Sequence, residues 1–470
     1  MPLVEVVELV PAYRLDPLHF VGIGGAGMSG IAAAYAELGL QVSGSDQSDA
    51  PALHQLAELG IRTSVGHEAA QVGEARTVVV SSAVRADNPE VAEAERRGLR
   101  IWHRSAALGA LMLNRRGIVV SGTHGKTSTS GMVASMLQGL GSDPGYVIGA
   151  PLATTGRSSS LGTGPDFVVE ADESDGSFLQ YPAEVVVVTN VEADHLDNWG
   201  SVESYVAGFQ QLVTEVPQVV LAESDPQTPM LAQVARSHGA TVWTVGESAA
   251  ADVQLREVIV TANRTSARLV AVDDEGPVEL AVPGRYNLHN AAAAYAAGRA
   301  LGYDGGELRA GLATFRGADR RFQLVGEENG IRIYDDYAHH PTELTALLAA
   351  AREQVPTRGR LVVAFQPHLF SRTESFAVEF VHALRGADRV LVCGIYPARE
   401  FQEDFPGVTA RILQEGLHSQ GREADYAESL DDAAAALASW VLPGDVVLTV
   451  GAGDITQLGP DLLARLRGRR

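Results

Sequence analysis

The sequence predicts an α/β protein of three domains, each built on a mostly parallel β-sheet with flanking helices. At 470 residues the chain is too long for a single hydrophobic core. Short apolar runs alternate with helix-forming segments, which is typical of parallel sheets covered by helices. This alternation starts again near residues 114–117 and near residue 317. We therefore expect domains at residues 1–115, 116–316 and 317–470.

The composition narrows the possible functions. A net charge of -22 argues against nucleic-acid binding, which needs a basic face. A hydrophobic content of 46% and a charged content of 20% are typical of soluble globular proteins. The only cysteine, Cys393, lies among apolar residues and is expected in the core. There is no signal-peptide pattern and no apolar run of about 18 residues, so we expect a cytoplasmic protein with no membrane segment.

The first predicted domain opens with a strand, a glycine turn and an alanine-rich helix that ends at about Leu38. Further strands are predicted at residues 41–45 and 77–81. Gly22, Gly24 and Gly27 form a G-x-G-x-x-G pattern, and Asp46 ends the next strand. This pattern is the dinucleotide-binding fingerprint, with the acid near the ribose. Because a helix N-terminus binds any diphosphate, both NAD and another nucleotide diphosphate remain candidates.

The second predicted domain begins with a strand at residues 118–120 and a second glycine turn. The turn contains Gly122, Gly125 and Lys126 and runs into a helix. Its backbone N–H groups favour phosphate, and Lys126 would contact the β- and γ-phosphates while Thr127 would hold Mg²⁺. The spacing departs from the standard P-loop, because two residues separate the glycines instead of four. The alternative is an ordinary glycine turn before a helix.

Two continuous apolar runs, at residues 166–170 and 184–188, predict buried parallel strands with polar residues at their ends. Residues 170–175 contain four acids, which favours a Mg²⁺ ligand there over a solvated acidic loop. The second run leads to His195, either a second metal ligand or a local hydrogen-bonding residue. Residues 240–282 suggest antiparallel strands, followed by a helix at residues 290–301.

The third predicted domain has strands at residues 361–365, 389–395 and 446–450, with helical segments between them. With the motifs already described, it completes a series that resembles the Mur ligases. The resemblance rests on residues 122–127, 170–178, 192–195, 284–290, 320–322 and 335–341, which occur in the family's order. Residues 22–28 and 365–373 are similar to the branch that adds L-alanine to UDP-N-acetylmuramate.

That resemblance implies a Rossmann-like N-terminal domain, a P-loop-like central ATPase domain and a Rossmann-like C-terminal domain. It also implies an ATP-dependent, Mg²⁺-requiring ligase that forms an acyl phosphate, which the amino acid then attacks. The implied catalytic residues are Lys126, His195, Arg321 and His340, and the implied metal ligands are Thr127, Glu173 and His195. The implied ATP-binding residues are Gly122, Thr123, His124, Gly125, Lys126, Thr127, Ser128, Asn287, Asn290, Arg321 and Asp336. The implied substrate-binding residues are Gly24, Gly25, Ala26, Gly27, Asp46, Ser82, His368 and Arg372.

One position departs from several Mur ligases. The lysine that they carry after the Asp-His motif, modified to a carbamate, corresponds here to Phe209. The L-alanine-adding branch is similar in lacking that lysine. The alternatives are a ligase that recycles a tripeptide onto the same UDP-sugar, an NAD-dependent dehydrogenase, a small-molecule kinase and a nucleotide-binding switch. We expect small-molecule substrates, no nucleic-acid or membrane partner, and a monomer or homodimer.

Overall fold

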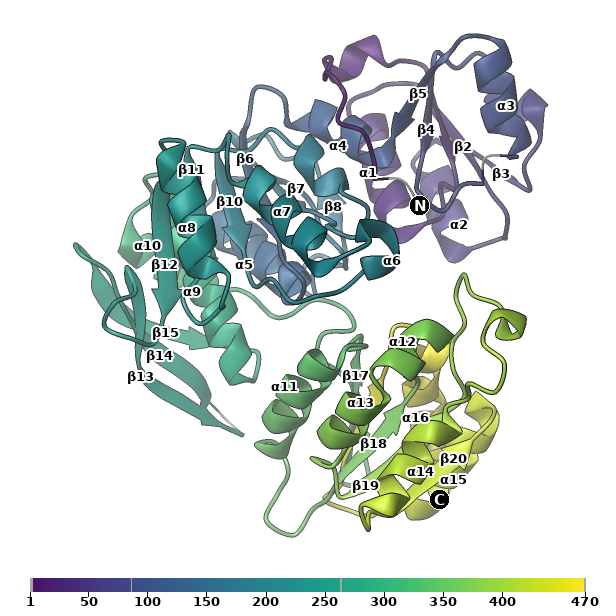
Figure 1. Cartoon of the computed structure of the whole chain (residues 1–470), viewed down its shortest axis with the longest axis vertical. Coiled ribbons are helices and arrows are strands. Elements are labelled where there is room, and N and C mark those ends of the chain that lie inside the picture. Colours follow the sequence, from purple (N-terminus) through teal and green to yellow (C-terminus); the bar gives the residue numbers. More distant parts are fainter. Residues whose placement is uncertain (1–2, 86, 263, 469–470) are drawn as a thin grey trace. The chain divides into compact units, whose positions relative to one another are not determined.

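The computed structural model describes residues 3–85, 87–262 and 264–468 (Figure 1). For Ala26 and Asp197, only the backbone is described. The chain divides into two compact units. The first comprises residues 1–257, 267–278 and 289–315, and the second comprises residues 258–266, 279–288 and 316–470. Each unit is described by itself below.

The N-terminal sheet has the strand order β3-β2-β1-β4-β5, and every neighbouring pair is parallel. Its strands are β1 (Leu18–Val21), β2 (Val42–Asp46), β3 (Arg62–Val65), β4 (Thr77–Val80) and β5 (Arg100–His103). The associated helices are η1 (Ala12–Arg14), α1 (Ala26–Glu37), α2 (Pro51–Glu58), η2 (Ala69–Val72), α3 (Pro89–Arg96) and α4 (Arg104–Met112). The strand order reverses at β1, so the turn after β1 opens at the edge where ligands of such sheets bind.

The sequence did not reveal β3 and β5. Both are short, and β3 has two exposed end residues and two partly buried central residues instead of an apolar run. Their pairing with β2 and β4 is therefore a product of the tertiary structure. The helix expected to end at about Leu38 ends at Glu37.

The central sheet has the order β15-β14-β13-β12-β11-β10-β6-β9-β7-β8, and the division into units runs through its last three strands in sequence. Its strands are β6 (Arg116–Ser121), β7 (Gly145–Val147), β8 (Ser159–Ser160), β9 (Asp166–Glu170), β10 (Val185–Val188), β11 (Gln218–Ala222), β12 (Thr241–Gly246), β13 (Val253–Thr261), β14 (Arg264–Val270) and β15 (Glu275–Leu280). The associated helices are α5 (Lys126–Gly139), η3 (Ser177–Gln180), α6 (Leu196–Trp199), α7 (Val202–Leu212), α8 (Thr228–Ser237), α9 (Arg285–Ala300) and α10 (Gly305–Leu312).

In the sheet order β12-β11-β10-β6-β9-β7, every neighbouring pair of strands is parallel. The pair β7 and β8 is antiparallel. Residues 240–282, where antiparallel strands were expected, form β12 to β15 of this same sheet. The pair β12 and β13 is parallel, which differs from that expectation. Burial alternates along β15, as a strand with one wet face requires. The helix expected from Asn290 begins earlier, at Arg285, after a turn at Gly284 with φ of 101°.

The C-terminal sheet has the order β16-β17-β21-β18-β19-β20, parallel except for the pair β16 and β17. Its strands are β16 (Gln323–Glu328), β17 (Ile331–Asp336), β18 (Leu361–Phe365), β19 (Arg389–Cys393), β20 (Ala424–Ala427) and β21 (Val446–Val450). Its helices are α11 (Pro341–Arg352), α12 (Phe370–Ser375), α13 (Ala377–Leu384), η4 (Gln402–Asp404), α14 (Arg411–Ser419), α15 (Leu430–Trp440), η5 (Asp454–Gln457) and α16 (Leu458–Arg467).

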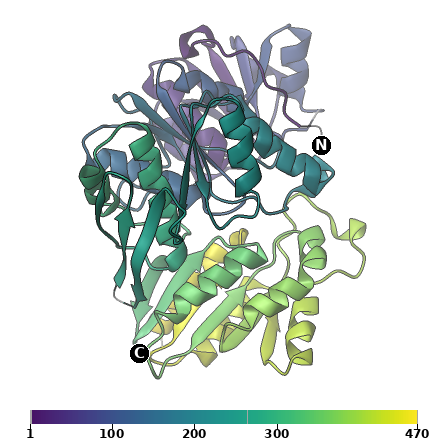
Figure 2. The ribbon, with the colours of Figure 1, turned by 60° about the vertical axis from the view of Figure 1, so that its left-hand side comes forward.

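Two apolar cores enclose the C-terminal sheet. Leu361 and Val363 of β18 pack with residues of α11, α13 and α14, while Val362 and Ala364 pack with residues of α15 and α16. Figure 2 shows the green helices and the yellow helices on opposite faces of this sheet. The alternation along β18 explains why its sequence is apolar at every position.

In the first unit, one apolar core joins the N-terminal and central sheets. It contains Phe20 and Trp102 from the N-terminal sheet, and Val119, Phe167 and Phe178 from the central part.

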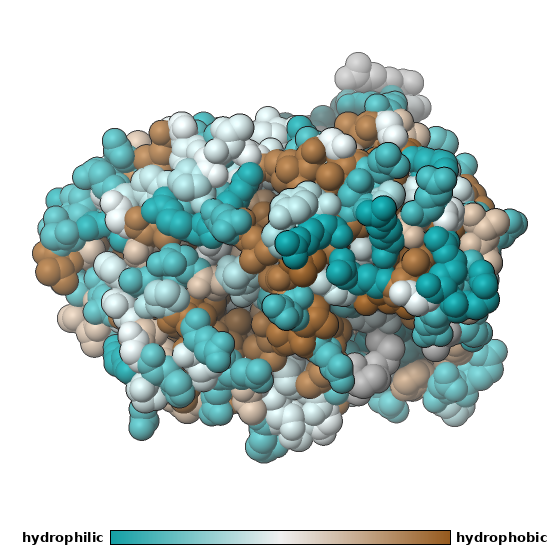
Figure 3. Space-filling view, turned by 90° about the horizontal axis from the view of Figure 1, so that it is seen from above, coloured by the Kyte–Doolittle hydropathy of each residue, from teal (hydrophilic) through white to brown (hydrophobic). Residues whose placement is uncertain are grey.

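Polar and apolar side chains are interspersed over the face drawn in Figure 3. Among the described residues, no helix is long and apolar enough to span a membrane.

Candidate active site

The second glycine turn connects β6 to α5 and has the shape expected of a phosphate loop. Gly122 has φ of 127° and Gly125, the N-cap of α5, has φ of 82°, both in the region that favours glycine. A Cβ at Gly125 would lie 3.0 Å from Oδ1 of Asn290, so the loop approaches α9 closely. Ser128 is buried in the first turn of α5. The backbone N–H groups at the start of this 14-residue helix favour an anion.

Lys126 is held inside this loop. Its Nζ donates to the carbonyl oxygens of Gly122 at 2.7 Å and Thr123 at 3.1 Å, and to Glu173 at 2.9 Å. Burial by itself lowers the pKa of Lys126, but Glu173 and the neighbouring carboxylates outweigh it and raise that pKa above the ordinary value. The ammonium therefore stays charged, as a group that neutralises phosphate must.

Glu173 and Thr127 offer oxygen ligands for a hard cation. Nζ of Lys126 lies 2.9 Å from Oε2 of Glu173, but within the described structure that oxygen has no hydrogen-bond partner and is buried. The hydroxyl of Thr127 donates to Oε1 of Glu170 at 2.9 Å. Burial raises the pKa of Glu173 to about 7, against the opposing effect of Lys126. The Oε2 of Glu173, which makes an ion pair with Lys126, is a carboxylate oxygen of the kind that Mg²⁺ prefers as a ligand.

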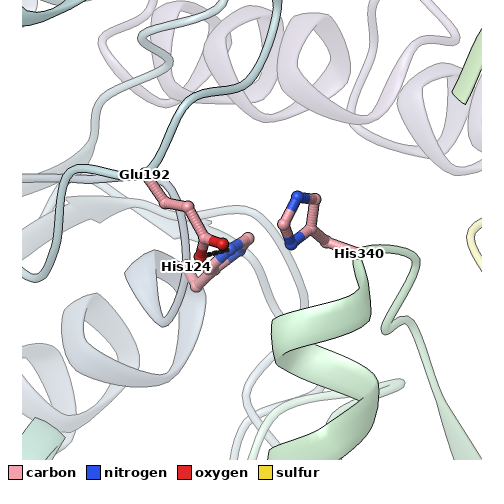
Figure 4. Close-up of side chains that lie close together, drawn as sticks. All are labelled: His124, Glu192 and His340. Atoms are coloured by element: carbon pink, nitrogen blue, oxygen red, sulfur yellow. Dashed lines mark hydrogen bonds and ion pairs between the residues drawn. The ribbon is translucent and has the colours of Figure 1, made fainter. Parts of the chain in front are cut away.

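His124 lies beside the acidic end of a neighbouring strand. Its backbone N–H donates to Oδ1 of Asn190 at 2.9 Å, and its Nε2 lies 3.1 Å from Oε2 of Glu192 (Figure 4). These bonds fasten the loop to the segment after β10. His195 follows in the same segment and is the N-cap of α6, with φ of 53°. Its Nε2 lies 3.5 Å from Oδ2 of Asp194.

Phe209, at the position of the family's modified lysine, is fully buried in an aromatic cluster. Its ring packs against Phe178 at a centroid distance of 5.1 Å and against Tyr205 at 5.3 Å. Trp199 packs on the same cluster and donates its Nε1 hydrogen to the carbonyl of Glu173 at 2.9 Å. The phenylalanine thus supports the loop that carries Glu173 by packing.

The acidic loop at residues 172–175 connects the phosphate loop to the N-terminal sheet. Asp172 accepts a hydrogen bond from Nη2 of Arg104 at 2.8 Å, and Asp175 accepts one from the hydroxyl of Ser82. His103 contacts the same group, with its Nε2 3.1 Å from Oγ of Ser82. Arg104 lowers the pKa of the Asp172 carboxyl, against the effect of burial, so that this carboxyl is ionised. One loop therefore touches both sheets of the first unit.

The first glycine turn is closed by its own contacts with β2. The N–H groups of Gly22 and Ile23 donate to the carbonyl of Ser45 at 2.8 and 2.9 Å, and Gly24 N–H donates to Oδ2 of Asp46 at 2.9 Å. A Cβ at Gly24 would lie 2.8 Å from Cδ1 of Leu53 and 2.9 Å from the same carboxylate oxygen, so a side chain there would displace Leu53 and Asp46.

The remaining residues of this turn lead into α1. Gly25 is the N-cap of α1, and Ala26 begins the helix, although the side chain of Ala26 lies outside the described part. At Gly27 a Cβ would lie 3.0 Å from Nη1 of Arg104. The absence of a side chain at Gly27 therefore gives the guanidinium access to the first turn of α1.

In the second unit, Asp336 ends β17 and accepts hydrogen bonds from the N–H groups of Phe322 at 2.7 Å and Ala338 at 2.8 Å. Burial raises the pKa of Asp336 to about 6, while the nearby Arg321 acts in the opposite direction. The Arg321 guanidinium lies over the ring of Tyr337, 5.3 Å from its centroid. On α9, Nδ2 of Asn287 donates to the carbonyl of Pro283 at 2.7 Å.

A second group in this unit contains three histidines and an arginine. His340 is buried at the N-terminus of α11, where its ring accepts from Thr342 N–H at 3.4 Å. The ring of His368 stacks on Tyr396 with centroids 5.9 Å apart and meets His339 at 5.8 Å. Burial lowers the pKa of His339 to about 3, and Arg372 and His368 act in the same direction. Arg372, on α12, is 7% exposed.

Several of these residues escaped the sequence analysis. Arg104 follows β5, which was itself not predicted, and Asn190 carries no motif of its own. His103 belongs to none of the motifs described above, yet it lies at the junction of the two sheets with Ser82. These residues could have been found from their position in the sequence, because polar residues directly after buried parallel strands lie at the ligand-binding edge of the sheet.

Family models match most of the chain. The Mur ligase family catalytic domain matches residues 17–116, the Mur ligase middle domain matches residues 120–298, and the Mur ligase glutamate ligase domain matches residues 320–453. The chain belongs to the Mur ligase family. This membership confirms the predicted family and gives no support to the dehydrogenase alternative.

Individual Mur ligases are similar over the full length. The UDP-N-acetylmuramate–L-alanine ligase of Cutibacterium acnes is 54% identical over 472 residues, covering 100% of both chains. The crystal structure of UDP-N-acetylmuramate–alanine ligase from Thermotoga maritima has a TM-score of 0.81 at 30% identity, covering 96% of this chain and 99% of that one. A murein peptide ligase from Psychrobacter arcticus shares the fold, with a TM-score of 0.71 at 24% identity over 96% of this chain and 98% of that one. The predicted three-domain α/β fold class is confirmed.

Proposed function

We infer that this Mur ligase uses ATP to join L-alanine to the lactyl carboxylate of UDP-N-acetylmuramate, a step of peptidoglycan precursor synthesis. The identity of 54% over the whole chain to a ligase of that name supports the choice of both substrates. ADP and phosphate are the other products.

The observation that carries this inference is the double attachment of the acidic loop. Glu173 is paired with Lys126 in the phosphate loop, while Asp172 is paired with Arg104 beside the first glycine turn. Two anion-binding turns are thereby fixed to one short segment. A ligase that activates a carboxylate with ATP needs this proximity, because phosphoryl transfer depends mainly on positioning and charge neutralisation.

In the first step, an oxygen of the lactyl carboxylate attacks the γ-phosphorus of ATP, and the bond from that phosphorus to the bridging oxygen of ADP breaks. Lys126 neutralises charge on the γ-phosphate, and the N–H groups of residues 122–128 hold the phosphate oxygens. Thr127 and Glu173 would hold one Mg²⁺ and His195 a second; when bound, these ions neutralise phosphate charge. Arg321 is assigned to the γ-phosphate, Asn287 and Asn290 to adenine, and Asp336 to the ATP ribose.

In the second step, the neutral amine of L-alanine attacks the acyl carbon, and the carbon–oxygen bond to phosphate breaks. The amine loses a proton and phosphate departs, leaving the amide. We assign the alanine carboxylate to Arg372, whose guanidinium forms paired hydrogen bonds with a carboxylate. His368 and His340 are assigned to orienting the amine or polarising the acyl phosphate. The glycine turn, Asp46 and Ser82 are assigned to the UDP-sugar.

Three further assignments belong to this proposal. The domains are taken as residues 1–115 for the UDP-sugar, 116–316 for ATP, and 317–470 for the amino acid and nucleotide contacts. The protein acts in the cytoplasm as a monomer or homodimer, on small molecules alone. Mg²⁺ is required, since the buried Oε2 of Glu173 offers it an oxygen ligand.

Phosphate release from ATP tests the function directly. The purified chain is supplied with ATP, Mg²⁺ and UDP-N-acetylmuramate, and each member of a panel of amino acids and the recycled tripeptide is added in turn. We expect release only when the UDP-sugar is present, with L-alanine as the best acceptor. A preference for the tripeptide would favour the recycling ligase, and a stable phosphorylated product formed without any amine would indicate a kinase.

A further inference from the structure

A buried polar network lies beneath the N-terminal sheet, beside the first glycine turn. At its centre is Glu90, on α3, which is fully buried. Its Oε1 lies 3.1 Å from Nε2 of His19, and its Oε2 accepts a hydrogen bond from Oγ of Ser45 at 2.6 Å and lies 2.9 Å from Nδ1 of His67. One carboxylate thus joins β1, β2 and the segment after β3.

The carboxylate of Glu90 is ionised. Burial raises the pKa of Glu90, but its hydrogen-bond donors outweigh that effect and hold the pKa below the ordinary value. A buried carboxylate is costly unless polar groups compensate it, and here His19, Ser45 and His67 do so. His19 is also buried, and its Nδ1 lies 2.9 Å from Oγ of Ser43.

Only His67 extends from this network towards solvent. Its side chain is 22% exposed, whereas those of His19 and Glu90 are 1% and 0% exposed. His67 follows β3, whose last residue pairs with Asp46 of β2, and the N–H of Gly66 donates to the carbonyl of Asp46 at 2.7 Å. His67 therefore lies beside Asp46 at the carboxyl edge of the sheet.

The network determines which ring nitrogen of His67 carries hydrogen. Nδ1 faces Oε2 of Glu90 at 2.9 Å and Oγ of Ser45 at 3.0 Å. The ionised carboxylate has no hydrogen to offer, and Ser45 already donates its own to Glu90. When the ring carries a single N–H hydrogen, Nδ1 must hold it as the donor, and Nε2 is then an acceptor.

The neighbouring strands β1, β2 and β3 are expected to contact the diphosphate, the ribose and the base of a uridine diphosphate, in that order. The turn after β1 is assigned to the diphosphate and Asp46, at the end of β2, to the ribose. The next strand in the sheet is β3, so the base is expected at its end, where His67 lies. Uracil carries an imide N–H, a donor that matches an Nε2 acceptor, whereas cytosine has a bare acceptor nitrogen at that position.

We propose that His67 accepts a hydrogen bond from the imide N–H of the uracil base, and that Glu90 is a positioning residue that fixes the required tautomer of His67. This inference rests on the proposed UDP-sugar site and adds to it a determinant of base specificity. Glu90 acts through His67 and Ser45 without touching the substrate.

The test compares UDP with CDP, which differ in the base but share the ribose and diphosphate. Dissociation constants are measured by calorimetry for the full-length protein and its variants. We expect the unaltered protein to prefer UDP by about tenfold, the effect of one satisfied against one mismatched hydrogen bond. Glu90→Gln places an amide donor within reach of Nδ1, and it should lower this preference about fivefold while leaving ADP binding unchanged.

Asn88→Ala is the matched control. Asn88 caps the same helix, because its Oδ1 accepts from the N–H groups of Glu90 at 2.9 Å and Val91 at 3.4 Å. Its loss destabilises α3 but removes no side chain of the network, so the UDP preference should persist. If Asn88→Ala lowered the preference as much as Glu90→Gln, Glu90 would be a structural residue only.

His67→Phe provides a second test if Glu90→Gln does not fold, because His67 is partly exposed. It should abolish the preference between the two nucleotides. Equal binding of UDP and CDP by the unaltered protein would overturn this inference alone. Binding of neither nucleotide would contradict the proposed UDP-sugar site as well, so the two failures are distinguishable.

Discussion

The two glycine turns of the first unit follow the same plan but differ in how they hold charge. Each follows a strand inside a parallel sheet, contains a first glycine with positive φ, and leads into a helix. The turn after β6 contains its own cation, Lys126, bonded to the carbonyls of the loop. The turn after β1 contains no Lys or Arg, and the cation that approaches its end at Gly27, Arg104, comes from α4.

This difference fits the two roles proposed for the turns. A phosphoryl group that is transferred needs a charge fixed in place before the reaction, because preorganised charge lowers the barrier. A diphosphate that is only carried needs a shaped backbone and a moderate attraction. In the acidic loop, Glu173 pairs with Lys126 of the turn after β6, and Asp172 pairs with Arg104 beside the turn after β1. Substitutions at the two turns should therefore affect different ligands.

The largest effect is expected at the phosphate loop. Lys126→Ala should lower the rate of phosphate release about a hundredfold or more, the usual effect of losing one preorganised charge. UDP-sugar binding should remain nearly intact, because that ligand is assigned to the other turn. Phosphate release and equilibrium binding of the UDP-sugar are measured on the same preparation. Normal turnover by this variant would show that the loop has been assigned wrongly.

The acidic loop allows the two roles to be separated within four residues. Glu173→Gln should raise the Mg²⁺ concentration needed for ADP binding by about tenfold, because a neutral amide is a poor ligand for a hard cation. Asp175→Asn, whose carboxylate accepts from Ser82, is the matched control. It should weaken UDP-sugar binding instead and leave the Mg²⁺ requirement unchanged. If both variants shifted the Mg²⁺ requirement equally, Glu173 would not be a specific ligand.

The amino acid is assigned to neither turn, and a substitution of Arg372 tests this proposed separation. Arg372→Lys should raise the KM for L-alanine by about tenfold, since a lysine cannot form the paired hydrogen bonds of a guanidinium. The KM values for ATP and the UDP-sugar should change little. Equal rises in all three constants would indicate a general disturbance of the enzyme, and no change would place the alanine site elsewhere.

The smallest effect is expected at the first glycine turn. Gly27→Ala adds a Cβ 3.0 Å from Nη1 of Arg104, so the guanidinium must move. We expect the KM for the UDP-sugar to rise about fivefold, as mild overpacking predicts. Gly30→Ala, on the same helix, is the control, because its Cβ would meet Ser159 at 3.4 Å, an ordinary contact. An unchanged KM in Gly27→Ala would remove Arg104 from the substrate site.

The same contrast explains how much the sequence revealed. The glycine turn between β6 and α5 could be predicted because Gly122, Gly125, Lys126 and Thr127 lie within one short segment, and its phosphate-binding role stays a prediction. Arg104 was missed because it reaches the first turn only through the pairing of β5 with β4. The network of Glu90 was missed for the same reason, since Glu90 lies 45 residues after Ser45 in the sequence and only the folded structure brings them together.

Secondary structure followed the same rule. Continuous apolar runs such as β9 and β18 were predicted at the right residues, because burial on both faces requires an apolar residue at each position. The pair β16 and β17, which is antiparallel and mixes exposed with buried positions, gave no comparable signal.

The single cysteine, Cys393, is buried in β19 as expected. The assigned contacts of ATP and alanine stay predictions.

The central claim is that a carboxylate carried by the first turn attacks the phosphate held by the second. Isotope transfer tests it most directly. UDP-N-acetylmuramate labelled with ¹⁸O in both oxygens of the lactyl carboxylate is turned over with unlabelled ATP and L-alanine, and the released phosphate is analysed by mass spectrometry. An acyl phosphate requires one ¹⁸O atom to appear in each phosphate released. Phosphate without ¹⁸O would contradict this account.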